Sequence, residues 1–250
     1  FIGLIMNLFG IKLIIRVNNS PESYIYWLKP VSLISLILKN YIAKRNIVIF
    51  NSKRIKNYYQ TILQSKDNFI YIPNKIKFTN IKIQTSNKLF IASRLSWEKN
   101  FFYTKTKFEK FNFNHNYKFK CYSSSKERTN DLLDYKDLKI NFNDIYISFS
   151  YFEGMPNMAI EALINGAALI LSNCWAHVEL KMDLEKFNLG KRVIICDIQD
   201  QEINLIVNNF ISNIKKHNFE KTKLALYTYN KHLRLTYKKQ LDILCKRLES

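Results

Sequence analysis

The chain has 250 residues, of which 47% are hydrophobic, and it carries a formal net charge of +19 at pH 7 with a pI of about 9.7. This length and apolar content exclude a disordered chain and allow one large domain or two smaller ones. The positive charge favours anionic partners, namely nucleic acid, an anionic lipid surface or phosphorylated small molecules, without choosing among them.

In chain order, the first part of the sequence alternates apolar strand-like runs with runs of helical spacing. The opening apolar stretch is too short and too interrupted for a membrane span, and it predicts a helix that leads into a buried strand. The next elements are predicted as strand, helix, strand, helix and strand, at residues 11–17, 30–44, 46–52, 53–64 and 68–74. This order predicts a parallel sheet covered by helices.

A polar segment at residues 75–87 is interpreted as a linker, and a second cycle of alternating elements follows it. Strands are predicted at 88–95, 116–123, 144–150, 167–173 and 192–198. Helices are predicted at about 100–111, 156–165, 201–216 and 220–248. We therefore expect an α/β fold of two units with parallel sheets, of which the first is incomplete in this chain.

The stretch FEGMPNMAIEALINGAALILSN at residues 152–173 contains the first candidate site. It follows the apolar run DIYISFS, which is typical of a strand buried on both faces. In open parallel sheets, ligands bind outside the carboxyl ends of the strands, so residues 151–155 are expected where a ligand would lie. Pro156 suits the first position of the next helix, and Gly166 suits a left-handed residue at its end.

Two carboxylates frame the start of this predicted helix. Glu153 precedes the helix, and Glu161 lies five residues inside it, roughly 7–8 Å along the axis from its start. Between them, Gly154 permits a close backbone approach, and the first-turn amides around Asn157 offer a partial positive charge to a phosphate. Carboxylates accept hydrogen bonds from sugar hydroxyls, so the two glutamates suit different parts of one extended ligand such as a nucleotide sugar.

A second candidate segment, SRLSWEKN at residues 93–100, also follows an apolar strand. It places two cations, Arg94 and Lys99, at the carboxyl end of that strand. Arginine can bind a phosphate with two parallel hydrogen bonds, and lysine acts as a point charge. The pair is therefore a candidate clamp for a diphosphate leaving group.

These residues resemble the motifs of the nucleotide-sugar-binding domain of retaining glycosyltransferases of family 4, which have the GT-B fold. The family motif E-G-x-P-N-x-x-x-E-A is matched by Glu153, Gly154, Met155, Pro156, Asn157, Glu161 and Ala162. The family loop R-L-x-x-x-K is matched by Arg94, Leu95 and Lys99. IPNK at 72–75 and SNCWAHVE at 172–179 approximate two further family segments.

The resemblance implies two Rossmann-like domains. We expect a partial N-terminal, acceptor-side domain at residues 1–78 and a donor-binding domain at 79–228. The helix at 229–250 is expected to cross back to the first domain.

The resemblance also implies the chemistry: transfer of a hexose-type sugar from a nucleoside-diphosphate sugar, with retention of configuration. Glu153 would face the donor hexose and Glu161 the ribose hydroxyls, while Arg94 and Lys99 would hold the diphosphate. Backbone amides of residues 154–157 would assist. No metal and no other cofactor is expected, and a UDP-sugar is favoured over a GDP-sugar as the co-substrate.

The implied acceptor is a polysaccharide, lipopolysaccharide or lipid-linked glycan of the cell envelope. The four cysteines are widely spaced, which fits a reducing cytoplasm, and the basic C-terminal helix would allow peripheral contact with an anionic membrane at its inner face. Two alternatives stay open: an inactive fragment or pseudoenzyme, and a basic protein that binds RNA or a membrane surface. The basic residues are spread along the chain without a nucleic-acid-binding signature, so no nucleic acid is expected.

Overall fold

A computed structural model describes residues 13–17, 46–63, 68–76, 87–111, 117–123, 132–197, 199 and 202–249. The helices predicted at the start of the chain and at 30–44 lie outside these residues, as does most of the predicted linker at 75–87. The chain divides into two compact units. The first comprises residues 1–75, 152–155 and 233–250, and the second comprises 76–151 and 156–232.

The first unit contains a parallel three-stranded sheet in the order β1-β2-β3. Its strands and helix are β1 (Ile14–Val17), β2 (Ile47–Phe50), α4 (Lys53–Leu63) and β3 (Phe69–Tyr71). Alternate residues of the central strand face opposite sides, as the period of a β-strand requires. Val48 and Phe50 pack against α4, whereas Ile49 packs against the last part of α9 (Phe219–Glu249), which belongs to this unit from residue 233.

The second unit contains a parallel six-stranded sheet in the order β6-β5-β4-β7-β8-β9. The strands are β4 (Lys88–Ala92), β5 (Lys118–Ser123), β6 (Leu133–Asp134), β7 (Ile145–Ser148), β8 (Ala168–Leu171) and β9 (Val193–Ile195). Every residue of β4, β7 and β8 is buried, which explains why these segments are apolar almost without interruption.

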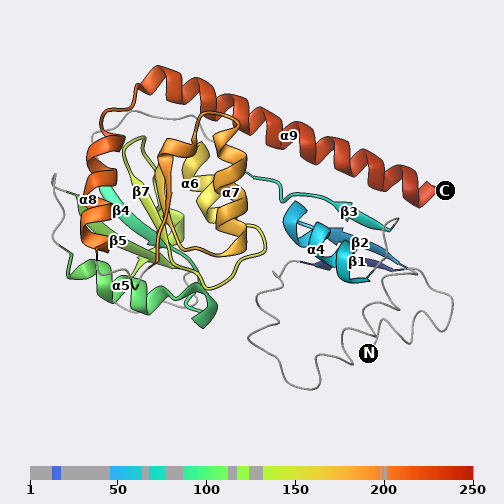
Figure 1. Cartoon of the computed structure of the whole chain (residues 1–250), viewed down its shortest axis with the longest axis horizontal. Helices are drawn as coiled ribbons and strands as arrows, with labels where there is room; N and C mark the ends of the chain where they lie inside the picture. Colours follow the sequence, from blue (N-terminus) through green and yellow to red (C-terminus); the bar gives the residue numbers. More distant parts are fainter. Residues whose placement is uncertain are drawn as a thin grey trace. The chain divides into compact units, whose positions relative to one another are not determined.

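Helices cover both faces of this sheet, as Figure 1 shows. The helices are α5 (Phe101–Glu109), α6 (Asn157–Ile164), α7 (Trp175–Glu185) and α8 (Ile203–Ile214). Leu89, Ile145 and Ile170 form one core cluster with apolar residues of α5 and α8. On the other face lie α6 and α7, whose inner residues are also buried (Figure 1).

The elements predicted from the sequence are present wherever the structure describes them, with ends that differ by a few residues. Local chemistry sets both ends of α6, which begins at Asn157 with Pro156 at its N-cap and is followed by Gly166 with φ 103°. The Gly166 amide donates to the carbonyl of Leu163 at 2.8 Å, which satisfies one of the last helical carbonyls. The short edge strand β6 and the helix α7 were not predicted.

Candidate functional site

Three neighbouring strands of the large sheet, β4, β7 and β8, end at the same edge because they are parallel. The loops that follow them therefore start close together, as expected for a ligand site in an open α/β sheet. The Tyr151 amide donates to the carbonyl of Glu98 at 2.9 Å, and the rings of Tyr151 and Trp97 lie 6.2 Å apart. The structure thus joins the loop at 93–100 to the start of the loop that follows β7.

Arg94 and Lys99 lie in the first of these loops, as predicted. The Arg94 side chain is 68% exposed and lies 3.5 Å from the carboxylate of Glu98. Lys99 is half-buried at the end of a short 3₁₀ helix, η1 (Trp97–Lys99). Asn100 follows with φ 50°, in the left-handed region, and α5 begins at the next residue.

Glu98 was not singled out from the sequence, although it organises this loop. Its Oε1 atom accepts a hydrogen bond from the Ser96 hydroxyl at 2.7 Å and also faces Arg94. Burial alone would raise the pKa of the Glu98 carboxyl, but hydrogen bonds, led by that of Ser96, and the charges of Arg94 and Lys99 outweigh burial and lower this pKa. Glu98 therefore stays charged, and its ion pair with Arg94 restrains that exposed side chain.

The residues of the glutamate motif divide between the two units. Glu153, Gly154 and Met155 are half-buried and group with the first unit, where the Asn74 amide lies 3.1 Å from the Met155 sulfur. Pro156 is buried and groups with the second unit.

Asn157 and Glu161 also lie in the second unit, on successive turns of α6. Asn157 is exposed at the start of the helix and Glu161 is half-buried. This part of the motif stands in the same unit as Arg94 and Lys99.

Tyr135 contacts Glu161, and the sequence contained no signal for it. The Tyr135 hydroxyl lies 3.2 Å from Glu161 Oε2 and also contacts the Met158 sulfur. Burial, the Glu161 charge and the hydrogen bond raise the pKa of Tyr135 above its usual value, so the phenol stays protonated at neutral pH. The two residues are 26 positions apart and are brought together by the fold, in which Tyr135 directly follows the edge strand β6.

A partly buried polar network joins the loops after β7 and β8. The Ser172 hydroxyl donates to the carbonyl of Ser150 at 2.6 Å, and His177 Nδ1 lies 3.0 Å from the same hydroxyl. Since the Ser172 proton points to Ser150, the hydroxyl oxygen accepts from His177, which assigns the proton of the imidazole to Nδ1. His177 is fully buried in the first turn of α7. Its hydrogen bond to Ser172 therefore links α7 to the loop after β8.

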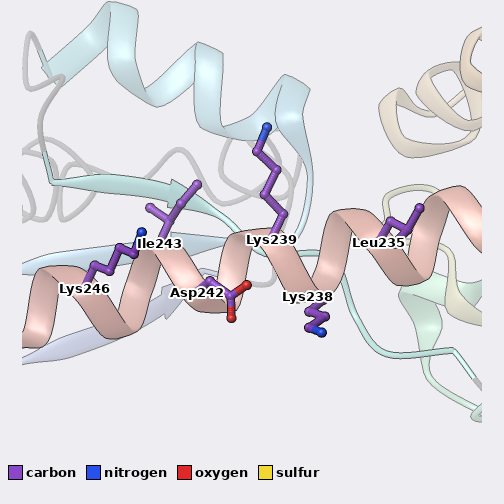
Figure 2. Close-up of a pocket in the computed structure, with 6 residues that line it drawn as sticks. All are labelled: Leu235, Lys238, Lys239, Asp242, Ile243 and Lys246. Carbon is purple, nitrogen blue, oxygen red and sulfur yellow. The ribbon is translucent and has the colours of Figure 1, made fainter.

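A hollow of about 390 Å³ lies along α9 in the first unit. Figure 2 shows that its labelled lining residues all come from this one helix: Leu235, Lys238, Lys239, Asp242, Ile243 and Lys246. None of them is a predicted site residue.

Within the part of the chain that the structure describes, no group of three or more histidine, cysteine, aspartate or glutamate side chains could hold a metal ion. In the same residues, no helix is both long and apolar enough to cross a membrane.

Comparison with solved structures identifies the fold. Anabaena Alr3699/HepE, solved in complex with UDP and glucose, matches with a TM-score of 0.65 at 13% identity, over 98% of this chain and 74% of that one. The pneumococcal O-GlcNAc transferase GtfA, in complex with UDP and GlcNAc, matches with a TM-score of 0.59 at 11% identity, over 96% and 53%. This chain shares their fold.

Sucrose-phosphate synthase from Thermosynechococcus elongatus also matches, with a TM-score of 0.58 at 12% identity, over 88% of this chain and 64% of that one. The chain thus spans less than two thirds of this synthase and about half of the O-GlcNAc transferase. No model of a known protein family matches the sequence, and no curated protein does. The likeness confirms the predicted fold class, α/β of the GT-B type with parallel sheets.

Proposed function

We propose that the chain works in a retaining glycosyltransferase that moves a hexose-type sugar from a nucleoside-diphosphate sugar to a glycan or lipid-linked acceptor. One observation carries the proposal: the loop with Arg94 and Lys99 contacts the loop after β7 at the carboxyl edge of a parallel sheet, and that second loop leads into the helix of Glu161. Cations and an acidic acceptor at such an edge suit the diphosphate and the ribose of one nucleotide.

Each residue then has a defined role. Arg94 and Lys99 bind the diphosphate and stabilise the negative charge that develops as the glycosidic bond breaks. Glu161 accepts hydrogen bonds from the ribose hydroxyls, and Glu153 faces the donor hexose. The backbone amides of Gly154, Met155 and Asn157 assist at the phosphate, with no metal required.

Retention follows if the acceptor attacks from the face that the leaving group occupies. In that case the two glutamates are not the acid and nucleophile of a glycosidase. UDP is the favoured nucleotide, and the UDP present in the HepE and GtfA structures supports this choice.

The proposal includes peripheral contact with an anionic membrane, where a lipid-linked acceptor would lie. The last part of α9 exposes both leucines and lysines, namely Leu235, Lys238, Lys239, Lys246 and Leu248. Lysines attract anionic headgroups, and exposed leucines can enter the interface.

Calorimetric titration of UDP, GDP and ADP onto the protein tests the donor site. We expect UDP to bind with a Kd on the order of micromolar and Glu161→Gln to weaken binding by roughly 10- to 100-fold, because a hydrogen bond to a charged group contributes about 1.5–3 kcal/mol. Glu109→Gln is the matched control, since it removes an exposed carboxylate from a helix of the same unit. Absence of nucleotide binding at millimolar concentration contradicts the proposal.

A further inference from the structure

We propose that Tyr135 is a positioning residue for the nucleotide ribose: its phenol holds one oxygen of Glu161 so that the other oxygen meets the ribose hydroxyls. The inference rests on the proposed function, in which Glu161 receives the ribose. It adds a residue that no sequence motif indicates, and it predicts how the site distinguishes ribose from deoxyribose.

The backbone around Tyr135 is anchored independently of Glu161. β6 pairs with β5 through Leu133 and Asp134, so the chain enters the next turn in a fixed register. The Asp134 carboxylate accepts from the Lys136 amide at 2.9 Å and caps the 3₁₀ helix η3 (Tyr135–Asp137). The Leu138 amide closes that helix on the carbonyl of Tyr135 at 3.2 Å. The phenol therefore projects from a preformed turn.

The hydroxyl of Tyr135 has one proton and two neighbours that could accept it. A carboxylate oxygen is a strong acceptor and a thioether sulfur is a weak one, so the proton goes to Glu161 rather than to Met158. Among the described residues, Tyr135 makes the only hydrogen bond to the carboxylate of Glu161. The Oε1 atom of Glu161 thus keeps its full capacity to accept.

A carboxylate whose orientation is already fixed binds a ligand more tightly than one that rotates freely. The terminal torsion of a glutamate is broad, and its restriction on binding costs conformational entropy. A hydrogen bond from a rigid aromatic side chain removes part of this cost before the ligand arrives. The raised pKa of Tyr135 keeps the donor protonated across the neutral range, so this restraint does not depend on pH there.

The test compares UDP with 2′-deoxy-UDP on the wild-type protein and on Tyr135→Phe, which keeps the ring and removes the hydroxyl. We expect the variant to bind UDP roughly 3- to 20-fold more weakly and 2′-deoxy-UDP nearly as well as the wild type does, so the preference for ribose narrows. Tyr103→Phe is the control, because Tyr103 is an exposed tyrosine on α5 of the same unit. Thermal unfolding checks that each variant is folded.

A double variant separates positioning from packing. If Tyr135 acts through Glu161, Tyr135→Phe adds little to the loss that Glu161→Gln causes alone. An equal loss of affinity for both nucleotides, or additive losses in the double variant, would overturn the inference. If the wild type binds UDP and Tyr135→Phe binds both nucleotides unchanged, the inference fails while the proposed function stands. If the wild type binds no nucleotide, the proposed function itself fails.

Discussion

Charged side chains at the two edges of the large parallel sheet differ in burial and in hydrogen bonding. At the amino ends of the strands, Lys88, Asp144 and Arg192 are buried, and each has partners inside the protein. At the carboxyl ends, Arg94 is exposed, and Glu161 is half-buried with one hydrogen bond to its carboxylate from the residues that the structure describes.

The amino edge shows what a buried charge requires. Asp144 accepts from the amides of Lys88 and Asn141 and lies 3.3 Å from the Lys88 ammonium, which also donates to the carbonyl of Lys139. Burial raises the pKa of the Asp144 carboxyl, although Lys88 and the amide donors oppose the shift. Arg192 donates to the carbonyls of Phe142 and Gly166 at 2.8 and 2.5 Å. These hydrogen bonds offset part of the cost of desolvation, although Nε and Nη1 of Arg192 are buried without a hydrogen-bond partner among the described residues.

The contrast between the two edges distinguishes charges that stabilise the fold from charges that can bind a ligand. A charge that is satisfied within the protein stabilises the fold, whereas a charge with spare hydrogen-bonding capacity at the carboxyl edge can bind a ligand. Substitutions at the two edges should therefore act on different observables, namely stability at the amino edge and affinity at the carboxyl edge.

The largest effect on stability is expected at the amino edge. Asp144→Ala leaves the Lys88 ammonium buried without its carboxylate and removes the acceptor of two amides, so we expect the free energy of unfolding to fall by about 3–5 kcal/mol. Urea denaturation measures this loss. The control is Asp183→Ala, which breaks a surface ion pair with Lys186 and should change stability by less than about 1 kcal/mol. Equal losses of unfolding free energy in the two variants would contradict the expectation that the buried carboxylate stabilises the fold more than the exposed one.

A smaller effect, on affinity instead of stability, is expected at the carboxyl edge. Arg94→Gln removes an exposed cation, so the unfolding free energy should change by about 0.5 kcal/mol or less, while UDP should bind about tenfold more weakly. Calorimetry with UDP and with uridine separates the contribution of the diphosphate, since uridine affinity should stay the same. Lys110→Gln, at the exposed end of α5, controls for the loss of one positive charge. A parallel fall in uridine affinity would place Arg94 elsewhere than at the diphosphate.

The smallest effect concerns pH. Burial and then the nearby charges of Arg192 and Lys191 lower the pKa of His217 below its usual value of 6.5. The unfolded chain then binds more protons than the folded one just below pH 6.5, so stability is fully present above that pH and declines as the pH falls through the folded pKa. We expect His217→Gln to flatten the decline between about pH 7 and 5 in denaturation measurements. An unchanged slope would contradict this assignment.

Local pattern was sufficient for most of the elements. β4, β7 and β8 are continuous apolar runs because both of their faces are covered, and such runs are visible in any sequence. α7 was missed because its buried residues, Ala176, His177, Leu180 and Leu184, form a narrow stripe that begins after an unusual cap, Cys174. β6 was missed because a strand of two residues has no detectable period.

The sequence by itself determined the fold class and the order of most strands and helices along the chain, and it singled out Arg94, Lys99, Glu153 and Glu161 as candidates, because these depend on spacing within short segments. Only the tertiary structure decided which distant side chains meet. The contact of Tyr135 with Glu161, the restraint of the Arg94 loop by Tyr151, and the burial of Arg192 against two carbonyls each depend on strand order in the sheet. Parallel strands are joined by crossovers, so neighbours in space come from segments far apart in the chain, and no local pattern records them.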